Sequence, residues 1–228
     1  MKFNDLAWAA VCFYYRSAGD KRYRRMMSNH DFLKRLRQAP GNVSSREFEE
    51  QVVLGFINVE HYDLLKQHRL ADTILQHITE VVSEMPAVTK KSLLTCDIND
   101  PETADIIENT FFMLKMNGMW TTGVSKIAHV LNDSLFPILS PELAQHFRIS
   151  DDSESLKRWF RIVQEDIRQA ADEFKMTGLP GSPEGFLSEK LGYHSEGYEK
   201  SLVKLADEYY WLRHGDCLPV PPHWTPVD

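Results

Sequence analysis

Apolar residues recur at helical spacing along most of this chain of 228 residues. In the first segment, Phe3, Leu6, Ala7, Ala10 and Val11 fall on one stripe of a 3.6-residue period. No stretch shows the sustained alternation of apolar and polar residues that marks a half-buried strand. The sequence therefore predicts an all-α, multi-helix globular fold. We expect helices over 3–16, 21–38, 44–56, 59–85 (one or two helices), 101–118, 125–131, 141–147, 151–174 and 198–214, with a break at 19–20 between the first two.

Residues with capping chemistry mark the starts of several of these segments. Ser44 and Asp100 carry side-chain oxygens that can accept the unpaired N–H groups of a first helical turn. Pro101 suits the first helical position, where no N–H is needed. Ser140 precedes Pro-Glu in the same way, and 151–153 combines two aspartates with a serine. These positions predict helix starts that do not depend on the rest of the fold.

The length and composition of the chain favour one helical domain. A hydrophobic content of 43% is enough for a sizeable core. We expect 1–216 to form a single domain, with two possible lobes that meet near 99–120. A Gly-rich connection lies over 178–197, and an irregular Pro-rich tail is expected over 217–228.

Cysteine and histidine patterns argue against several classes of site. The three cysteines are far apart and form no CxxC pair, which favours a reducing, cytoplasmic setting over a disulfide framework. The nine histidines show neither HxH nor HExxH spacing, so we expect no metal site and no cofactor. No apolar run approaches the length of a membrane span, and no membrane association is expected. The oligomeric state is left open.

Charge is distributed unevenly along the chain. The formal net charge is −7, but residues 16–37 hold eight basic and two acidic side chains, a balance of +6 that leaves −13 for the remainder. Such a segment can contact a phosphate backbone, although the acidic chain as a whole is not suited to coating nucleic acid. The candidate phosphate-contacting residues of this segment are Lys21, Arg22, Arg24 and Arg25.

A second candidate site lies in the segment 117–140. The pattern predicts a tight turn at Gly123 and a new helix that starts near Ser125. The N-terminus of a helix carries unpaired N–H groups and partial positive charge, which suit an anion. We expect Thr122, Gly123, Ser125 and the ammonium of Lys126 to contact nucleic-acid phosphates. The simpler interpretation is a plain helical corner with a solvated lysine, and the histidine at 129 is expected to pack inside.

The same segment carries a glycine followed by Ser125-Lys126, then His129 and Leu131 in the next helix, and then the sequence Phe-Pro-Ile at 136–138. With these residues it resembles the hairpin region of helix-hairpin-helix DNA glycosylase-like proteins, in particular a poorly characterised bacterial branch. The resemblance covers roughly 115–155. In this superfamily the hairpin amides hold a DNA phosphate, and some members use a lysine at the start of the second helix to attack the sugar.

This resemblance places Lys126 at the nucleophilic lysine and Ser140 at the position of the assisting aspartate. A serine supplies no carboxylate to stabilise a developing cation or to accept a proton at neutral pH. A serine in place of the aspartate favours a non-catalytic protein that contacts nucleic-acid phosphates. Two alternatives stay open: a regulatory module that binds a protein partner, and a DNA glycosylase or lyase that uses Lys126.

Overall fold

The computed structural model describes residues 1–57, 70–115 and 121–221, and every regular element in these ranges is helical. The prediction of an all-α fold is confirmed. The α-helices pack around a common core of buried apolar side chains. They are α1 (Phe3–Arg16), α2 (Ala18–Met27), α3 (His30–Gln38), α4 (Ser45–Phe48), α6 (Leu70–Glu84), α7 (Pro101–Leu114), α8 (Thr121–Leu131), α9 (Pro141–Phe147), α10 (Ser153–Met176), α11 (Pro183–Lys190) and α12 (Leu202–Tyr210).

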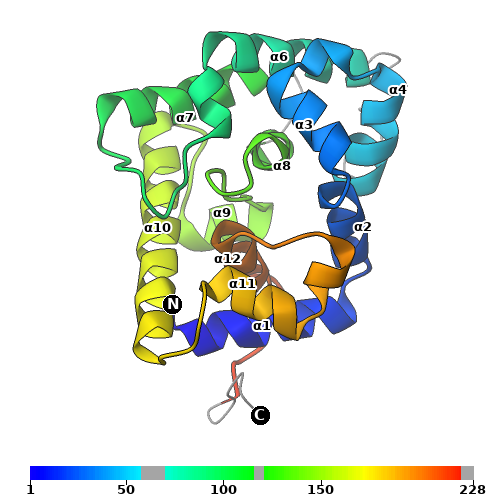
Figure 1. The fold of residues 1–228 in the computed structure, drawn as a ribbon. Coiled ribbons are helices and arrows are strands. Elements are labelled where there is room, and N and C mark those ends of the chain that lie inside the picture. Colours follow the sequence, from blue (N-terminus) through cyan, green and yellow to red (C-terminus); the bar gives the residue numbers. More distant parts are fainter. Residues whose placement is uncertain (58–69, 116–120, 222–228) are drawn as a thin grey trace.

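Helix α8 lies near the centre of the molecule. Figure 1 shows it framed by α10, α1, α2, α6 and α7. Nine of its eleven residues are buried, and the exceptions are Thr121 and Lys126. A helix that is buried on nearly all sides must be apolar or must satisfy its polar groups internally. The segment that the sequence singles out as a corner for an anion is therefore part of the core.

Several predicted helix starts are confirmed with their caps. The Ser44 hydroxyl accepts the Glu47 N–H, and the Asp100 carboxylate accepts the Thr103 N–H. Asp152 caps α10 in the same way. These bonds join residues three positions apart, so the local sequence is enough to specify them.

The basic segment forms two helices and not the single helix expected over 21–38. Asn29 caps α3 by accepting the Phe32 N–H, and Ser17 caps α2 by accepting the Asp20 N–H. The predicted break at 19–20 is wrong, because both residues lie in the first turn of α2. The interruption falls just before α3, where asparagine favours a cap over a continuing helix.

Other differences occur where the local signals are weak. The helix that Ser44 caps continues after α4 as a π-helical segment, η2 (Glu49–Ile57). The Gly-rich connection holds α11, because Ser182 caps a short helix there. In the part of the chain that the structure describes, three short 3₁₀ turns join the longer helices: η1 (Pro40–Asn42), η3 (Pro86–Thr89) and η4 (Tyr193–Glu196).

Two expected helices fall partly outside the described residues. Of the segment 59–85, residues 59–69 are not described, and the remainder forms α6 up to Glu84. Of the segment 101–118, the described part forms α7, which ends at Leu114. The predicted helix positions 116–118 lie outside the described ranges.

The last helix begins later than expected. It starts at Leu202 and passes into a π-helical segment, η5 (Trp211–Gly215). The chain is irregular from there to Pro221, and the remainder of the predicted tail lies outside the described residues. Within the described ranges, no helix combines the length and the apolar character that crossing a membrane requires.

Candidate functional site

The hairpin residues are placed differently from the prediction. Helix α8 already runs through Gly123, so the predicted turn at this glycine is wrong. Thr122 and Ser125 are buried, and the Ser125 hydroxyl donates to the Thr122 carbonyl at 2.9 Å and accepts the Leu139 N–H at 3.0 Å. A glycine within a helix costs only about 1 kcal/mol, whereas each buried aliphatic side chain of α8 contributes about 1.5–3 kcal/mol. The free energy gained by burying these side chains therefore exceeds the cost of the glycine, and the helix continues through it.

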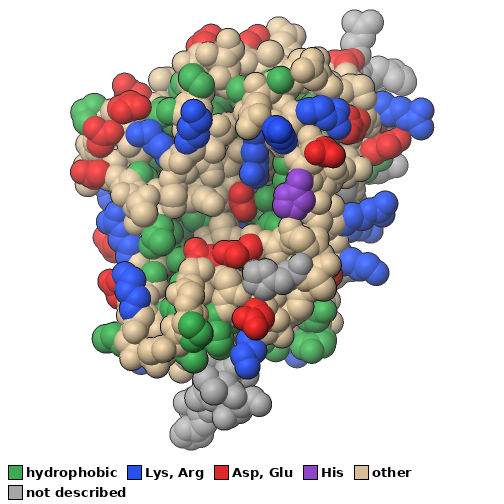
Figure 2. Space-filling view, in the orientation of Figure 1, with side chains coloured by type: hydrophobic (Ala, Val, Ile, Leu, Met, Phe, Trp, Pro, Cys, Tyr) green, Lys and Arg blue, Asp and Glu red, His purple; other side chains and the backbone are tan. Residues whose placement is uncertain are grey.

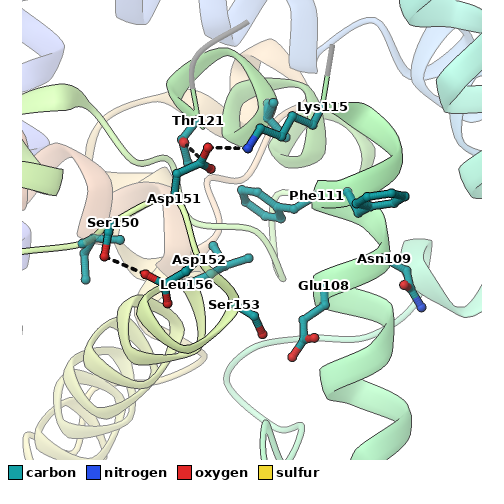
Figure 3. A pocket seen from close by; sticks show the side chains of 13 residues that line it. Glu108, Asn109, Phe111, Lys115, Thr121, Ser150, Asp151, Asp152, Ser153 and Leu156 are labelled. Atoms are coloured by element: carbon teal, nitrogen blue, oxygen red, sulfur yellow. Dashed lines mark hydrogen bonds and ion pairs between the residues drawn. The ribbon is translucent and has the colours of Figure 1, made fainter. Parts of the chain in front are cut away.

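The carboxylate of Asp151 lies at the N-terminal end of α8. The Thr121 hydroxyl donates to Asp151 at 3.2 Å, and Lys115 forms an ion pair with the same aspartate (Figure 3). The neighbouring pocket, of about 300 Å³, is also lined by Glu108 and Asp152. Hydrogen bonds from a nearby serine hydroxyl and from the first turn of α10 lower the pKa of Asp152 to about 2, so this group is anionic at neutral pH. These carboxylates disfavour a phosphate at the described part of this corner.

Lys126 and Ser140, the pair that the glycosylase resemblance singles out, both have structural contacts. Lys126 is half-buried, and its ammonium lies 3.5 Å from the Ile57 carbonyl oxygen. The Ser140 hydroxyl accepts the Leu143 N–H and caps α9. This cap explains the serine, because a short hydroxyl side chain is well suited to accepting a first-turn N–H.

His129 packs inside the molecule, as expected. Its Nδ1 lies 2.6 Å from the Phe136 carbonyl oxygen, and its Nε2 lies 2.8 Å from the Tyr23 hydroxyl. A carbonyl only accepts, so Nδ1 carries the proton and Nε2 accepts from Tyr23, which in turn accepts from Tyr198 at 3.2 Å. Burial lowers the pKa of His129 to about 3 and keeps the ring neutral.

Arg24 does not face solvent, which corrects its place among the candidate phosphate contacts. Its guanidinium is 2.8 Å from the Asp20 carboxylate and also pairs with Glu196. Asp20 is fully buried and meets the ammonium of Lys200 at 2.6 Å, and Glu208 meets the same ammonium at 2.7 Å. Arg24 is thus one member of a buried ion cluster, formed by Asp20, Arg24, Lys200, Lys204 and Glu208.

The sequence reasoning missed this buried ion cluster. One signal was present: Lys200, Lys204 and Glu208 follow one another at a spacing of four, which places these charges on one face of the helix expected over 198–214. Nothing local indicates that Asp20 lies opposite that face. The partners come from the two ends of the chain and meet only in the folded protein.

The other basic residues of α2 do face solvent. Lys21, Arg22 and Arg25 are exposed and occupy positions i, i+1 and i+4, which share one side of the helix. Figure 2 shows Lys and Arg side chains projecting along the edge of the molecule that α2 forms. Arg16 is exposed at the end of α1, next to Tyr15, whose side chain is 78% exposed. We name Arg16, Lys21, Arg22 and Arg25 the basic face.

Comparison with known proteins assigns no class to this chain. No family model, curated protein or solved structure matches it. Among the described residues, no group of three or more His, Cys, Asp or Glu side chains is arranged to hold a metal ion. The functional argument therefore rests on the geometry of the basic face and of the cavities.

Proposed function

We propose that this protein is a non-catalytic helical module that contacts nucleic-acid phosphates through the basic face. One observation carries the proposal. Three arginines of the basic segment are engaged by carboxylates, whereas no side chain of the basic face has an ion-pair partner among the described residues. The engaged pairs are Arg24–Asp20, Arg35–Glu47 and Arg37–Asp133. These three cations are neutralised within the fold, whereas those of the basic face are available to a ligand.

Exposed lysine and arginine side chains bind phosphates without reading bases. Each neutralised phosphate releases counterions, so the affinity falls as the salt concentration rises. The net charge of −7 confines such binding to the part of the surface where cations gather. We therefore expect weak, salt-sensitive binding with little sequence preference.

Tyr15 extends the basic face with an aromatic surface. Its ring packs edge-on against Tyr14, with 5.0 Å between the centroids, and the side chain is otherwise largely open to solvent. Unpaired bases stack on such rings at about 1–3 kcal/mol per base, while the bases of a duplex are already stacked on their neighbours. This geometry favours single strands over duplexes.

The resemblance to helix-hairpin-helix glycosylase-like proteins belongs to the same proposal, but the phosphate contacts are assigned to other residues than the resemblance implies. The residues 122–125 are buried inside α8, so the contact with phosphates is assigned to α2 and the end of α1. The residues 116–120, which precede α8, lie outside the described ranges.

Fluorescence anisotropy of labelled single-stranded and duplex 20-mers at several salt concentrations tests the proposal. The variant Lys21→Gln/Arg22→Gln/Arg25→Gln should bind about tenfold more weakly, and the slope of log K against log salt should become shallower by about 2–3. The matched control Lys2→Gln/Lys175→Gln/Lys190→Gln loses the same charge from exposed positions elsewhere. Equal losses in both variants, or no binding by the wild type at low salt, would refute the proposal and favour a protein partner.

A further inference from the structure

A groove crosses the face of the molecule between α3 and α11. A cavity of about 580 Å³ lies between α3 and the connection from α11 to α12. A second cavity, of about 600 Å³, extends towards the end of α10. Glu184 and Glu199 line both cavities, so the two are parts of one groove that meet at these carboxylates.

Opposite charges line the first cavity. Lys34 of α3 and Lys90 lie on one side, and Glu184 and Glu199 lie on the other. Figure 2 shows this separation: Lys and Arg side chains gather above the hollow, and Asp and Glu side chains gather within and below it. The view agrees with the positions of α3 and α11 in Figure 1.

These four side chains lack ion-pair partners within the described part of the chain. Arg37, Asp133 and Lys200 also line this cavity, but they already have ion-pair partners. Arg37 binds Asp133 at 3.1 Å, and Lys200 binds the buried carboxylates of Asp20 and Glu208. Across the cavity, the two lysines form no ion pair with the two glutamates. Burial, followed by the nearby Glu199, raises the pKa of Glu184, and hydrogen bonds from the Ser182 hydroxyl and from backbone N–H groups only partly oppose the rise.

The second cavity adds an apolar surface next to the carboxylates. Leu94 and Phe174 line it. Its two cations are already engaged, since Arg168 donates to the Leu94 carbonyl at 3.0 Å and Lys175 pairs with Asp172 at 2.9 Å. A ligand that fills the whole groove thus meets apolar side chains, together with carboxylates and ammonium groups that have no ion-pair partner among the described residues. Cavities of several hundred Å³ with apolar lining and a few polar anchors are typical of sites for small ligands.

We propose that this groove binds a short zwitterionic peptide. Its terminal ammonium lies at Glu184 and Glu199, its first side chain fills the cavity beside Phe174, and its terminal carboxylate meets Lys34 and Lys90. A dication satisfies only the carboxylates, and a dianion satisfies only the lysines. A peptide of two or three residues complements both walls and the apolar end. This inference goes beyond the nucleic-acid proposal, which concerns a different surface.

Isothermal titration of the full chain with the tripeptide Leu-Gly-Gly, its N-acetyl form and its C-terminal amide tests the inference. The unmodified peptide should bind, and each blocked form should bind about fivefold more weakly, since each loses one partly exposed ion pair. In Glu199→Gln the effect of acetylation should shrink. In Lys34→Gln/Lys90→Gln the effect of amidation should disappear while the effect of acetylation persists.

Control variants keep the charge change but leave the groove intact. Glu189→Gln removes an exposed carboxylate from α11, and Lys21→Gln removes an exposed ammonium from α2. Both should retain the wild-type pattern with all three peptides. The substituted groove positions are exposed, so these variants should fold, and circular dichroism checks that they do. Absence of binding of the unmodified peptide at millimolar concentration, or binding that is insensitive to both blocking groups, would overturn the inference.

Discussion

The buried ion cluster makes a quantitative prediction about stability. The side chain of Lys200 is fully buried, and its ammonium contacts Asp20 at 2.6 Å, Glu208 at 2.7 Å and the Tyr193 hydroxyl at 2.9 Å. In Lys200→Met, Asp20 keeps its arginine partner, but among the described side chains Glu208 retains only the ammonium of Lys204, at 3.6 Å. Removal of one partner from a buried ion pair costs about 3–5 kcal/mol. We expect a loss of this size in the free energy of unfolding at pH 7.

Urea unfolding followed by circular dichroism measures this loss. The double variant Lys200→Met/Glu208→Leu removes the stranded carboxylate together with the lysine. It should recover most of the loss, because apolar side chains of similar size can replace a buried pair. Lys190→Met, at an exposed site on α11, should change the free energy of unfolding by less than about 0.5 kcal/mol. A cost below about 1 kcal/mol for Lys200→Met would contradict the view that this lysine neutralises buried carboxylates.

The pH dependence of the same variant supplies a second check. Burial raises the pKa of Glu208, while Lys200 and Lys204 oppose the rise. Without Lys200 this pKa rises further, so between the unfolded and folded pKa values the native state binds more protons than the unfolded state. Stability then falls as the pH increases through this window. The deficit of Lys200→Met relative to wild type should be largest at neutral pH and should shrink on acidification.

Three further predictions concern Lys126, His129 and Gly178. Borohydride treatment with abasic DNA should trap no more adduct with wild type than with Lys126→Ala, and an adduct that this substitution abolishes would support the lyase alternative. Because the pKa of His129 is lowered to about 3, the unfolded state binds the extra proton, and stability should fall by up to about 1.4 kcal/mol per pH unit below about 6.5. Urea unfolding at pH 7 and pH 5 should show a smaller decrease in His129→Gln, and an equal decrease would argue against this assignment. Gly178 has φ +71° and open space where a Cβ would lie, so Gly178→Ala should cost only the backbone strain of about 1–2 kcal/mol in thermal unfolding, and a larger loss would indicate a packing role.

Local sequence patterns were enough to predict the helical character of the fold and many helix starts. The predicted range 3–16 matches α1, and the caps at Ser44, Asp100 and Asp152 are confirmed. Both signals act over short distances along the chain, since a 3.6-residue period and a cap to the third residue need no distant partner. Where the local signal is weak, as at 19–20, the sequence interpretation placed the break wrongly.

Which polar residues face solvent depends instead on how the helices pack. Arg22 and Arg24 look equivalent in the sequence, yet one is exposed and the other lies against Asp20. The same holds for Gly123, which suggests a turn in the sequence and is buried inside α8. Packing buries certain charges, and the cost of an unpaired charge in the core then requires a partner from elsewhere in the chain. Lys200 pairs with Asp20 for this reason, and no pattern within either segment contains that pairing.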